Sequence, residues 1–381
     1  MGFYCLSKEQ NQLIHFLFSC RTIGMGIEQW IYERLGWPEL EIVGAVASDL
    51  HQDDSVDYIQ EISRESYWEK EKKRLNKQPK KDCAILFKGP CDLAAIVPLL
   101  ENTGKVITEF NYIGPQDTTI AGFNHSAHII ESLTLGKEEL QQILTDAPFM
   151  DEGDFTTSLF AELYDVVFYS LLPDEHQGVY EHKKNGWKIS YNSRNYSLTD
   201  ERMWDKYITG DYENSFPFTR EILQKFSQNY RFIHDLSVED ILHNLQIIRS
   251  KLPQETLLVL MLGSEIESER NNAEFENSAP RHIEVNRAVE EKFRNVSNVK
   301  IINMTDFITS QDCFSGCTNH FSKKVYFEIA NRVAEIINEN TNSASKAYAP
   351  DSFHVKLKRR LMKFKHSFDK RANKLRWRLK R

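Results

Sequence analysis

The stretch CAILFKGPCD, which runs from Cys83 to Asp92, decides the fold. Its apolar first half predicts a buried strand at 83–87, and the glycine and proline then turn the chain into a helix expected at 92–100. The alternation continues, with strands expected at 106–112, 165–172, 257–262 and 299–302 and helices at 238–252, 282–295 and 322–338. A polar loop with Asn124-His125 and an inserted hairpin at 179–199 interrupt it. We therefore predict an α/β domain at 82–340 with a doubly wound, mainly parallel sheet.

Four smaller segments flank this domain. Residues 1–66 predict a small βαβ appendage, with a strand at 11–20, a helix after Gly26 and a second strand at 40–46. Such a piece buries little surface by itself, so we expect it to dock on something. The charged run at 67–81 and the small polar residues at 341–354 are expected to be linkers. Residues 355–381 predict a basic amphipathic helix.

The composition limits the class of protein to which this chain can belong. The 381 residues are 41% hydrophobic and 12% aromatic, which is enough for a sizeable core. The six cysteines form no dense framework and no signal peptide precedes them, so we expect a reduced, cytoplasmic setting. No apolar run reaches the roughly 18 residues that a transmembrane helix needs.

The net charge of −7 is unevenly distributed. Residues 355–381 hold 13 Lys and Arg against one acid, Asp369, a net +12, so the rest of the chain carries −19. The leucines and phenylalanines of this tail recur at helical spacing in one stripe. A basic helix with an apolar stripe lies well on an anionic membrane surface, so we expect a peripheral position on the inner face of the cell membrane. Nucleic acid is the competing anionic partner, and the acidic body makes it the less favoured one.

Three candidate sites follow expected strands or precede the last helix. In open parallel sheets, ligands bind at the carboxyl ends of the strands. The turn Gly89-Pro90-Cys91-Asp92 places a thiol at the start of a helix, where backbone N–H groups stabilise a thiolate or an oxyanion. Asp174 follows the strand at 165–172, and Asn319-His320 precede the last helix. Cys91 is therefore the candidate nucleophile and His320 the candidate base.

The order of these landmarks resembles the SGNH family of hydrolases and acyltransferases, whose fold is flavodoxin-like, over about 250 residues. Members carry a Gly-x-Ser turn after the first strand, Gly-x-Asn-Asp after a middle strand and Asp-x-x-His before the last helix. Here Cys91 takes the place of the serine, and Cys317 takes the place of the aspartate three residues before His320. The middle motif reads Leu171-Leu172-Pro173-Asp174. Some capsule-biosynthesis acyltransferase-like proteins also carry Gly-x-Cys at the first turn.

The resemblance implies acyl transfer or ester hydrolysis on a surface glycan, such as capsule polysaccharide, or on a lipid-linked precursor. A Cys-His dyad would replace the triad, since a thiol needs less activation than a hydroxyl. The residues expected to hold the oxyanion or the substrate are Gly89, Asp92, Gly122, Asn124, His125, Asp174 and Asn319. A catalytically inactive binding module in a polysaccharide or secondary-metabolite biosynthetic complex is the alternative.

Each candidate residue also has a structural interpretation. Cys91 after a buried strand is typical of a small core residue, His320 of a helix cap, and Asp174 of a cap on the turn that follows it. Cys313, Cys317 and His320 have a spacing that suggests zinc, but no fourth ligand lies near them in the sequence, so we expect no metal.

The appendage contains a second motif, Arg21-x-x-Gly24-x-Gly26, between its first strand and its helix. This is a phosphate-binding geometry. The segment is similar to the coenzyme A loop of GNAT acetyltransferases, and more specifically to the GNAT-like end of FkbH-like proteins, over about 60 residues. No cofactor is required, and acyl-CoA is the donor that this resemblance allows, bound by Arg21, Gly24 and Gly26. The alternative is a docking element whose glycines permit a tight turn.

Overall fold

The computed structural model describes residues 2–7, 11–18, 27–40, 50–52, 56, 83–114, 119–211, 216–273, 275–318, 320–341 and 343–348. The chain divides into two units, Met1–Gln78 and Pro79–Arg381. The division falls inside the segment 67–81 that the sequence predicts as a linker. Each unit is described by itself.

The N-terminal unit contains a hairpin and a helix. Strands β1 (Gly2–Ser7) and β2 (Gln12–Phe18) pair antiparallel, and helix α1 (Ile27–Arg34) follows. The strand β2 and the helix were predicted, whereas β1 was not. Gln12 forms an isolated parallel bridge with Glu39, as a βαβ connection requires. The predicted strand at 40–46 lies outside the described residues except for Leu40, and so do Arg21, Gly24 and Gly26.

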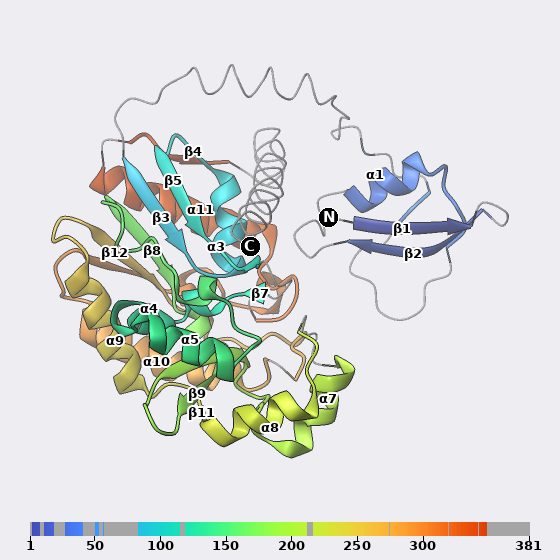
Figure 1. Cartoon of the computed structure of the whole chain (residues 1–381). Coiled ribbons are helices and arrows are strands. Elements are labelled where there is room, and N and C mark those ends of the chain that lie inside the picture. Colours follow the sequence, from blue (N-terminus) through green and yellow to red (C-terminus); the bar gives the residue numbers. More distant parts are fainter. Residues whose placement is uncertain are drawn as a thin grey trace, which may run out of the picture. The chain divides into compact units, whose positions relative to one another are not determined.

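The second unit is built on a five-stranded parallel sheet, in agreement with the predicted fold class. Its strands along the chain are β3 (Ala84–Lys88), β5 (Lys105–Glu109), β8 (Val166–Ser170), β12 (Leu257–Met261) and β13 (Val299–Ile302). They lie side by side in the order β5-β3-β8-β12-β13 (Figure 1). Numbered along the chain this order is 2-1-3-4-5, the order of flavodoxin-like doubly wound sheets.

Helices cover both faces of the sheet. Helices α3 (Cys91–Ile96) and α11 (Lys323–Asn340) pack on one face, together with Phe87 and Phe168, whose rings stack 4.8 Å apart. Helices α4 (Ser126–Thr134), α9 (Val238–Lys251) and α10 (Ser278–Phe293) pack on the other, against Leu86 and Val167. Neighbouring strand residues therefore point to opposite hydrophobic cores, which explains the continuous apolar runs of these strands.

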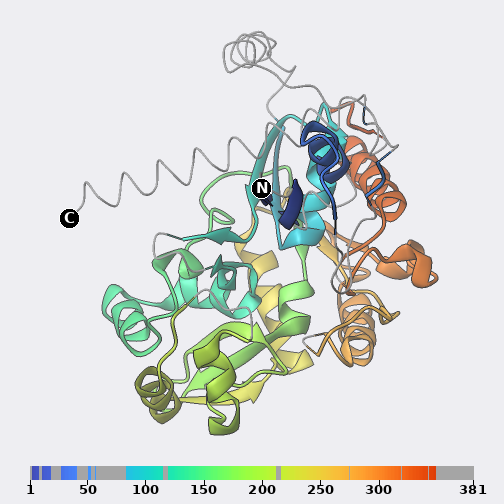
Figure 2. The ribbon, with the colours of Figure 1, turned by 90° about the vertical axis from the view of Figure 1, so that its right-hand side faces the viewer.

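An inserted part forms a third core beyond the sheet. The predicted hairpin is present as β9 (Gln177–His182) and β10 (Lys188–Ser193), and β11 (Tyr230–His234) adds an unpredicted third strand. Helices α5 (Lys137–Asp146), α7 (Trp204–Thr209) and α8 (Arg220–Asn229) pack around these strands. Figures 1 and 2 show this green to yellow-green part at one end of the domain.

The region predicted as a polar loop around Asn124 contains both α4 and α5. That prediction was wrong because α5 is polar over most of its length and buries only Ile143 and Asp146. Helical periodicity is weak in such a segment.

The remaining elements are short. They are β4 (Leu100–Glu101), β6 (Tyr112–Ile113), β7 (Thr119–Ile120), α6 (Leu172–His176), β14 (Lys346–Ala347) and 3-10 helices at Val97–Leu99, Gly122–Asn124, Glu152–Phe155, Glu201–Met203, Met304–Asp306 and Gln311–Cys313. Strand β14 pairs antiparallel with β4, so the segment predicted as a linker at 341–354 begins as part of the domain. Residues 355–381 lie outside the described residues. In the described part of the chain, every helix is too short or too polar to span a bilayer.

Candidate active site at the switch point of the sheet

The chain leaves β3 for β5 on one side and later returns to β8 on the other, which creates a switch point at the carboxyl ends of β3 and β8. The two ends approach closely at Gly89, where an added Cβ would lie 2.7 Å from the Cβ of Ser170. The Ser170 hydroxyl donates a 2.6 Å hydrogen bond to Asp92 Oδ2. Burial raises the pKa of Asp92. Gly89 therefore leaves room for the ends of β3 and β8 to approach, and Asp92 links them through its hydrogen bond with Ser170. Both are predicted site residues.

Cys91 is the first residue of α3 and is partly exposed at this edge. Leu93 of α3 and Val325 of α11 belong to the same hydrophobic core, so α3 and α11 pack together. Tyr326, in the first turn of α11, is buried. Burial raises the pKa of Tyr326 well above its ordinary value, and charge on Cys91 raises it further. Cys91 thus lies within electrostatic reach of the start of the last helix.

His320 lies in a tight loop before α11. Phe314 and Phe321 form an isolated antiparallel bridge, and the His320 N–H donates to the Cys317 carbonyl at 2.8 Å. The Sγ of Cys317 lies 3.2 Å from Nδ1 of His320. This is the nitrogen that a carboxylate holds in a Ser-His-Asp triad. Burial lowers the pKa of His320, which favours the neutral imidazole that a base requires. Charge on Cys317 also contributes to the raised pKa of Tyr326, so the charges of both thiols act on this hydroxyl.

Asn124 is fully buried beside the first turn. Its Nδ2 donates to the Gly89 carbonyl at 3.3 Å and to Asn111 Oδ1 at 2.9 Å, so both amide hydrogens are engaged. Among the described residues, its Oδ1 has no hydrogen-bond partner. The predicted oxyanion role of Asn124 therefore requires it to give up one of these bonds. Gly122 is buried too, and its N–H donates to Asp154 Oδ1 at 3.0 Å.

His125 and Asp174 support the start of α4. His125 Nδ1 accepts from the Ala127 N–H at 3.1 Å, so the hydrogen of the neutral ring is on Nε2. Asp174 accepts from the Ser126 N–H and, at 3.0 Å, from the Tyr169 hydroxyl. Burial raises the pKa of Asp174 to about 6. Asp174 thus caps α4, a distant helix, and not the turn that follows it. Asn319 lies outside the described residues.

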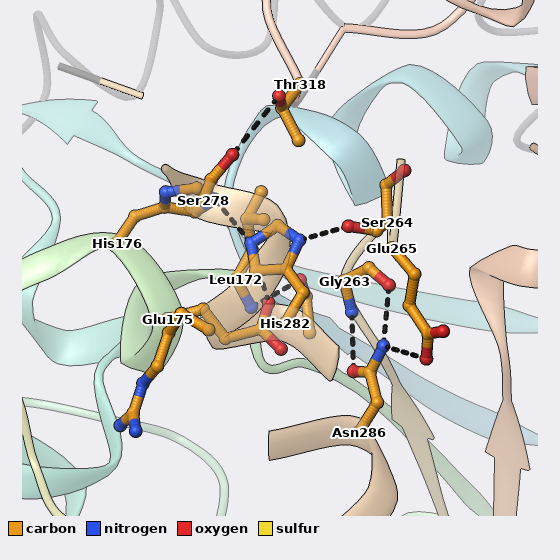
Figure 3. Close-up of polar contacts among 12 residues, drawn as sticks. Leu172, Glu175, His176, Gly263, Ser264, Glu265, Ser278, His282, Asn286 and Thr318 are labelled. Carbon is orange, nitrogen blue, oxygen red and sulfur yellow. Dashed lines mark hydrogen bonds and ion pairs between the residues drawn. The ribbon is translucent and has the colours of Figure 1, made fainter. Parts of the chain in front are cut away.

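A buried acid-base cluster, which the sequence did not predict, lies at the ends of β8 and β12 (Figure 3). It contains Glu175 and His176 of α6 and His282 of α10. His282 Nε2 lies 2.9 Å from His176 Nε2 and 3.5 Å from Glu175 Oε2. Glu175 and His282 are fully buried, and His176 retains 7% exposure.

Gly263, at the end of β12, makes room for this cluster. A Cβ at this position would lie 2.3 Å from Glu175 Oε2 and 2.7 Å from the His282 ring. Burial raises the pKa of Glu175 to about 8 and lowers that of His282 to about 4, so both are neutral near pH 7. The only sequence signal for the cluster was its position, because Glu175-His176 directly follow Asp174 at the carboxyl edge.

Two surface hollows lie in the inserted part, and Cys91 lines neither of them. One, of about 570 Å³, is lined by Arg194, Phe232 and His234, and the other, of about 760 Å³, by Glu138, His182 and Trp187. In the described part of the chain, no three His, Cys, Asp or Glu side chains are arranged to hold a metal ion.

No family model, curated protein or solved structure matches this chain. The function below is therefore argued from the residues and their geometry.

Proposed function

We propose that this chain is an acyl-transfer enzyme, an O-acyltransferase or an esterase, that works through Cys91 and His320. One observation carries the proposal: charge on partly exposed Cys91, at the switch point of the sheet, and charge on Cys317, which contacts His320, both act on the Tyr326 hydroxyl. Ligands of doubly wound sheets bind at this edge. The substrate class we propose is a surface glycan or a lipid-linked precursor, handled at the inner face of the membrane.

In the proposed reaction, the Cys91 Sγ attacks an acyl carbonyl and His320 Nε2 takes the thiol proton. When Nδ1 carries the ring hydrogen and donates it to Cys317 Sγ, Nε2 has no hydrogen and can accept a proton. Backbone N–H groups at the start of α3 hold the oxyanion. The intermediate collapses to a Cys91 thioester, and His320 returns the proton to the leaving group. An acceptor hydroxyl, or water in an esterase, then attacks the thioester and regenerates the thiol.

The dyad is tested by measuring ester hydrolysis and acyl transfer for the wild type, Cys91→Ala and His320→Ala. We expect each variant to lose at least about 100-fold in turnover, the lower range of general acid-base effects. Cys5→Ala is the matched control, because Cys5 is also partly exposed and belongs to the N-terminal unit. Unchanged activity in both site variants would overturn the dyad.

Binding of acetyl-CoA separates a transferase from a hydrolase. A rise in melting temperature with acetyl-CoA that is lost in Arg21→Ala supports a transferase with a donor site in the N-terminal unit. If acetyl-CoA does not raise the melting temperature of the wild type, the esterase is the form of the proposal that remains.

One observation favours the alternative of an inactive binding module. A neutral thiol is a weaker hydrogen-bond acceptor for His320 Nδ1 than a carboxylate, so Cys317 holds the ring less firmly. A wild-type protein that forms no acyl adduct would support this alternative.

A further inference from the structure

The hydrogen bonds of the buried cluster have a fixed direction. The Ser264 carbonyl contacts His282 Nδ1 at 2.5 Å and can only accept, so this nitrogen carries the hydrogen. Neutral His282 therefore has a bare Nε2. His176 Nε2, 2.9 Å away, must donate its hydrogen to that lone pair. It follows that a neutral His176 ring carries no hydrogen on Nδ1, its outer nitrogen.

Glu175 lies beside the inner end of this chain of hydrogen bonds. Its Oε2 is 3.5 Å from His282 Nε2, the nitrogen that would receive a proton from His176. Among the described residues, neither carboxyl oxygen of Glu175 makes a well-formed hydrogen bond, although the Gly263 N–H still lowers its pKa. A fully buried carboxylate with so little hydrogen bonding is costly unless a cation forms next to it. Protonated His282 would be that cation.

The cluster borders the proposed active site. The Ser278 hydroxyl, in the first turn of α10, lies 3.4 Å from the Thr318 hydroxyl, between Cys317 and His320 in the chain. Figure 3 shows Ser278 and Thr318 on one side of the His282 ring and Glu175 on the other. The ring of Phe275 packs edge-on against His176, with centroids 5.1 Å apart. His176, which retains 7% exposure, is thus the outer member of the cluster.

We propose that His176, His282 and Glu175 form a proton relay that activates the hydroxyl of the acyl acceptor. The proposal rests on the proposed function, in which a hydroxyl attacks the Cys91 thioester. The hydroxyl proton moves to His176 Nδ1 as the oxygen bonds to the acyl carbon. The hydrogen on His176 Nε2 then moves to His282 Nε2, and the Glu175 carboxylate balances the resulting imidazolium. The proton later returns along the same path as Cys91 regains its thiol.

The relay requires ionised Glu175. Burial, and then the charge of Asp174, raise the pKa of Glu175 to about 8; Arg281 and the Gly263 N–H oppose the shift, and Asp92 adds to it. Arg194 and Arg281 also disfavour the His282 cation. The relay step should therefore quicken as the pH rises through about 8.

The test separates thioester formation from transfer. The initial burst of released leaving group reports attack by Cys91, and product formed with an alcohol acceptor reports the relay. In Glu175→Gln we expect the initial burst to be unchanged and the rate of acyl transfer to the alcohol to fall by on the order of 100-fold. The increase of the transfer rate with pH near 8 should also disappear. Glu291→Gln, in helix α10, is the control, because Glu291 is 69% exposed. Unchanged transfer with an unchanged pH profile in Glu175→Gln would overturn the relay.

A second readout needs no activity. Histidine ¹⁵N spectra of the full chain report which ring nitrogen carries hydrogen. We expect His282 to show hydrogen on Nδ1 and His176 on Nε2, with a shift of the His282 signals near pH 8 that Glu175→Gln removes. The opposite tautomers, or a titration that persists in Glu175→Gln, would contradict the relay. A wild type with these spectra but no burst would instead refute the acyl-transfer proposal.

Discussion

Cys317 Sγ lies 3.2 Å from Nδ1 of His320, where a triad would place a carboxylate. The contact decides what His320 can do, because a neutral imidazole has one hydrogen for two nitrogens. If Nδ1 donates to Cys317, Nε2 is the base for Cys91. If Nδ1 instead takes the thiol proton of Cys317, Cys317 becomes the nucleophile.

Cys317→Asp distinguishes these two roles. An aspartate would hold the Nδ1 hydrogen more firmly than a thiol, so we expect turnover to rise by roughly tenfold, since a wrong tautomer in a Ser-His-Asp triad costs about 10⁴-fold. Steady-state kinetics with a model ester measures the change, with Cys317→Ser as the control of similar size. Loss of activity in Cys317→Asp, with activity retained in Cys91→Ala, would show that Cys317 is the nucleophile.

Gly89→Ala should destabilise the switch point. Its Cβ would lie 2.7 Å from Ser170 Cβ and 2.9 Å from a Leu93 methyl, so β3 and β8 must separate. Overpacking of this kind costs about 1–3 kcal/mol of unfolding free energy. Urea denaturation measures the loss. Gly136→Ala is the control, since its nearest neighbour would be Glu139 Oε2 at 3.4 Å, and an equal loss in both variants would refute the close approach at Gly89.

The buried Glu175 should make stability depend on pH. Its pKa is raised from 4.5 to about 8 in the fold, so the native state holds a proton that the unfolded state releases. Its contribution is fully present below pH 4.5 and falls by up to about 1.4 kcal/mol per pH unit as the pH rises to about 8.

Glu175→Gln removes this slope. The fall should be clearest above pH 6.5, because His282, with a pKa lowered to about 4, is then neutral in both states. Urea unfolding of the wild type and Glu175→Gln between pH 6.5 and 8 measures the difference. Parallel curves for the two proteins would show that Glu175 is ionised in the fold.

The basic tail predicts binding to anionic vesicles. Residues 355–381 carry a net +12, and each Lys or Arg near an anionic surface contributes about 1 kcal/mol. We expect the full chain to sediment with phosphatidylserine vesicles at about 0.1 M salt and to dissociate at about 1 M, as screening increases. A chain that ends at residue 354 should remain in solution. Equal sedimentation of both chains, or equal binding to neutral vesicles, would place the contact elsewhere.

The sheet could be predicted because its central strands β3, β8 and β12 are buried on both faces. The strand at 299–302 has the predicted bounds, and that at 257–262 ends one residue earlier, at Met261. Elements that contain both buried and exposed residues without a regular alternation were harder to predict. Strand β11 pairs with β9, which precedes it by almost fifty residues, and its burial does not alternate, so neither period nor spacing indicates the pairing.

The candidate site, like the fold, could be predicted only in part from the sequence. Turns in the sequence were enough to propose Cys91 and His320 as candidates, whereas the hydrogen bonds of Asn124 and Asp174 to Asn111, Ser126 and Tyr169 needed the structure. The cluster of Glu175, His176 and His282 joins two distant segments through burial. Helix α10 begins at Ser278 and not at His282 as predicted, so His282 lies inside the helix and faces the core.

Mass spectrometry of the protein mixed with an acyl donor tests the central claim most directly. The proposed function predicts one acyl adduct on the wild-type chain, mapped to the peptide that contains Cys91. The adduct should be absent from Cys91→Ala and should form at least about 100-fold more slowly in His320→Ala. No adduct on the wild type, or an adduct that persists in Cys91→Ala, would contradict catalysis by Cys91.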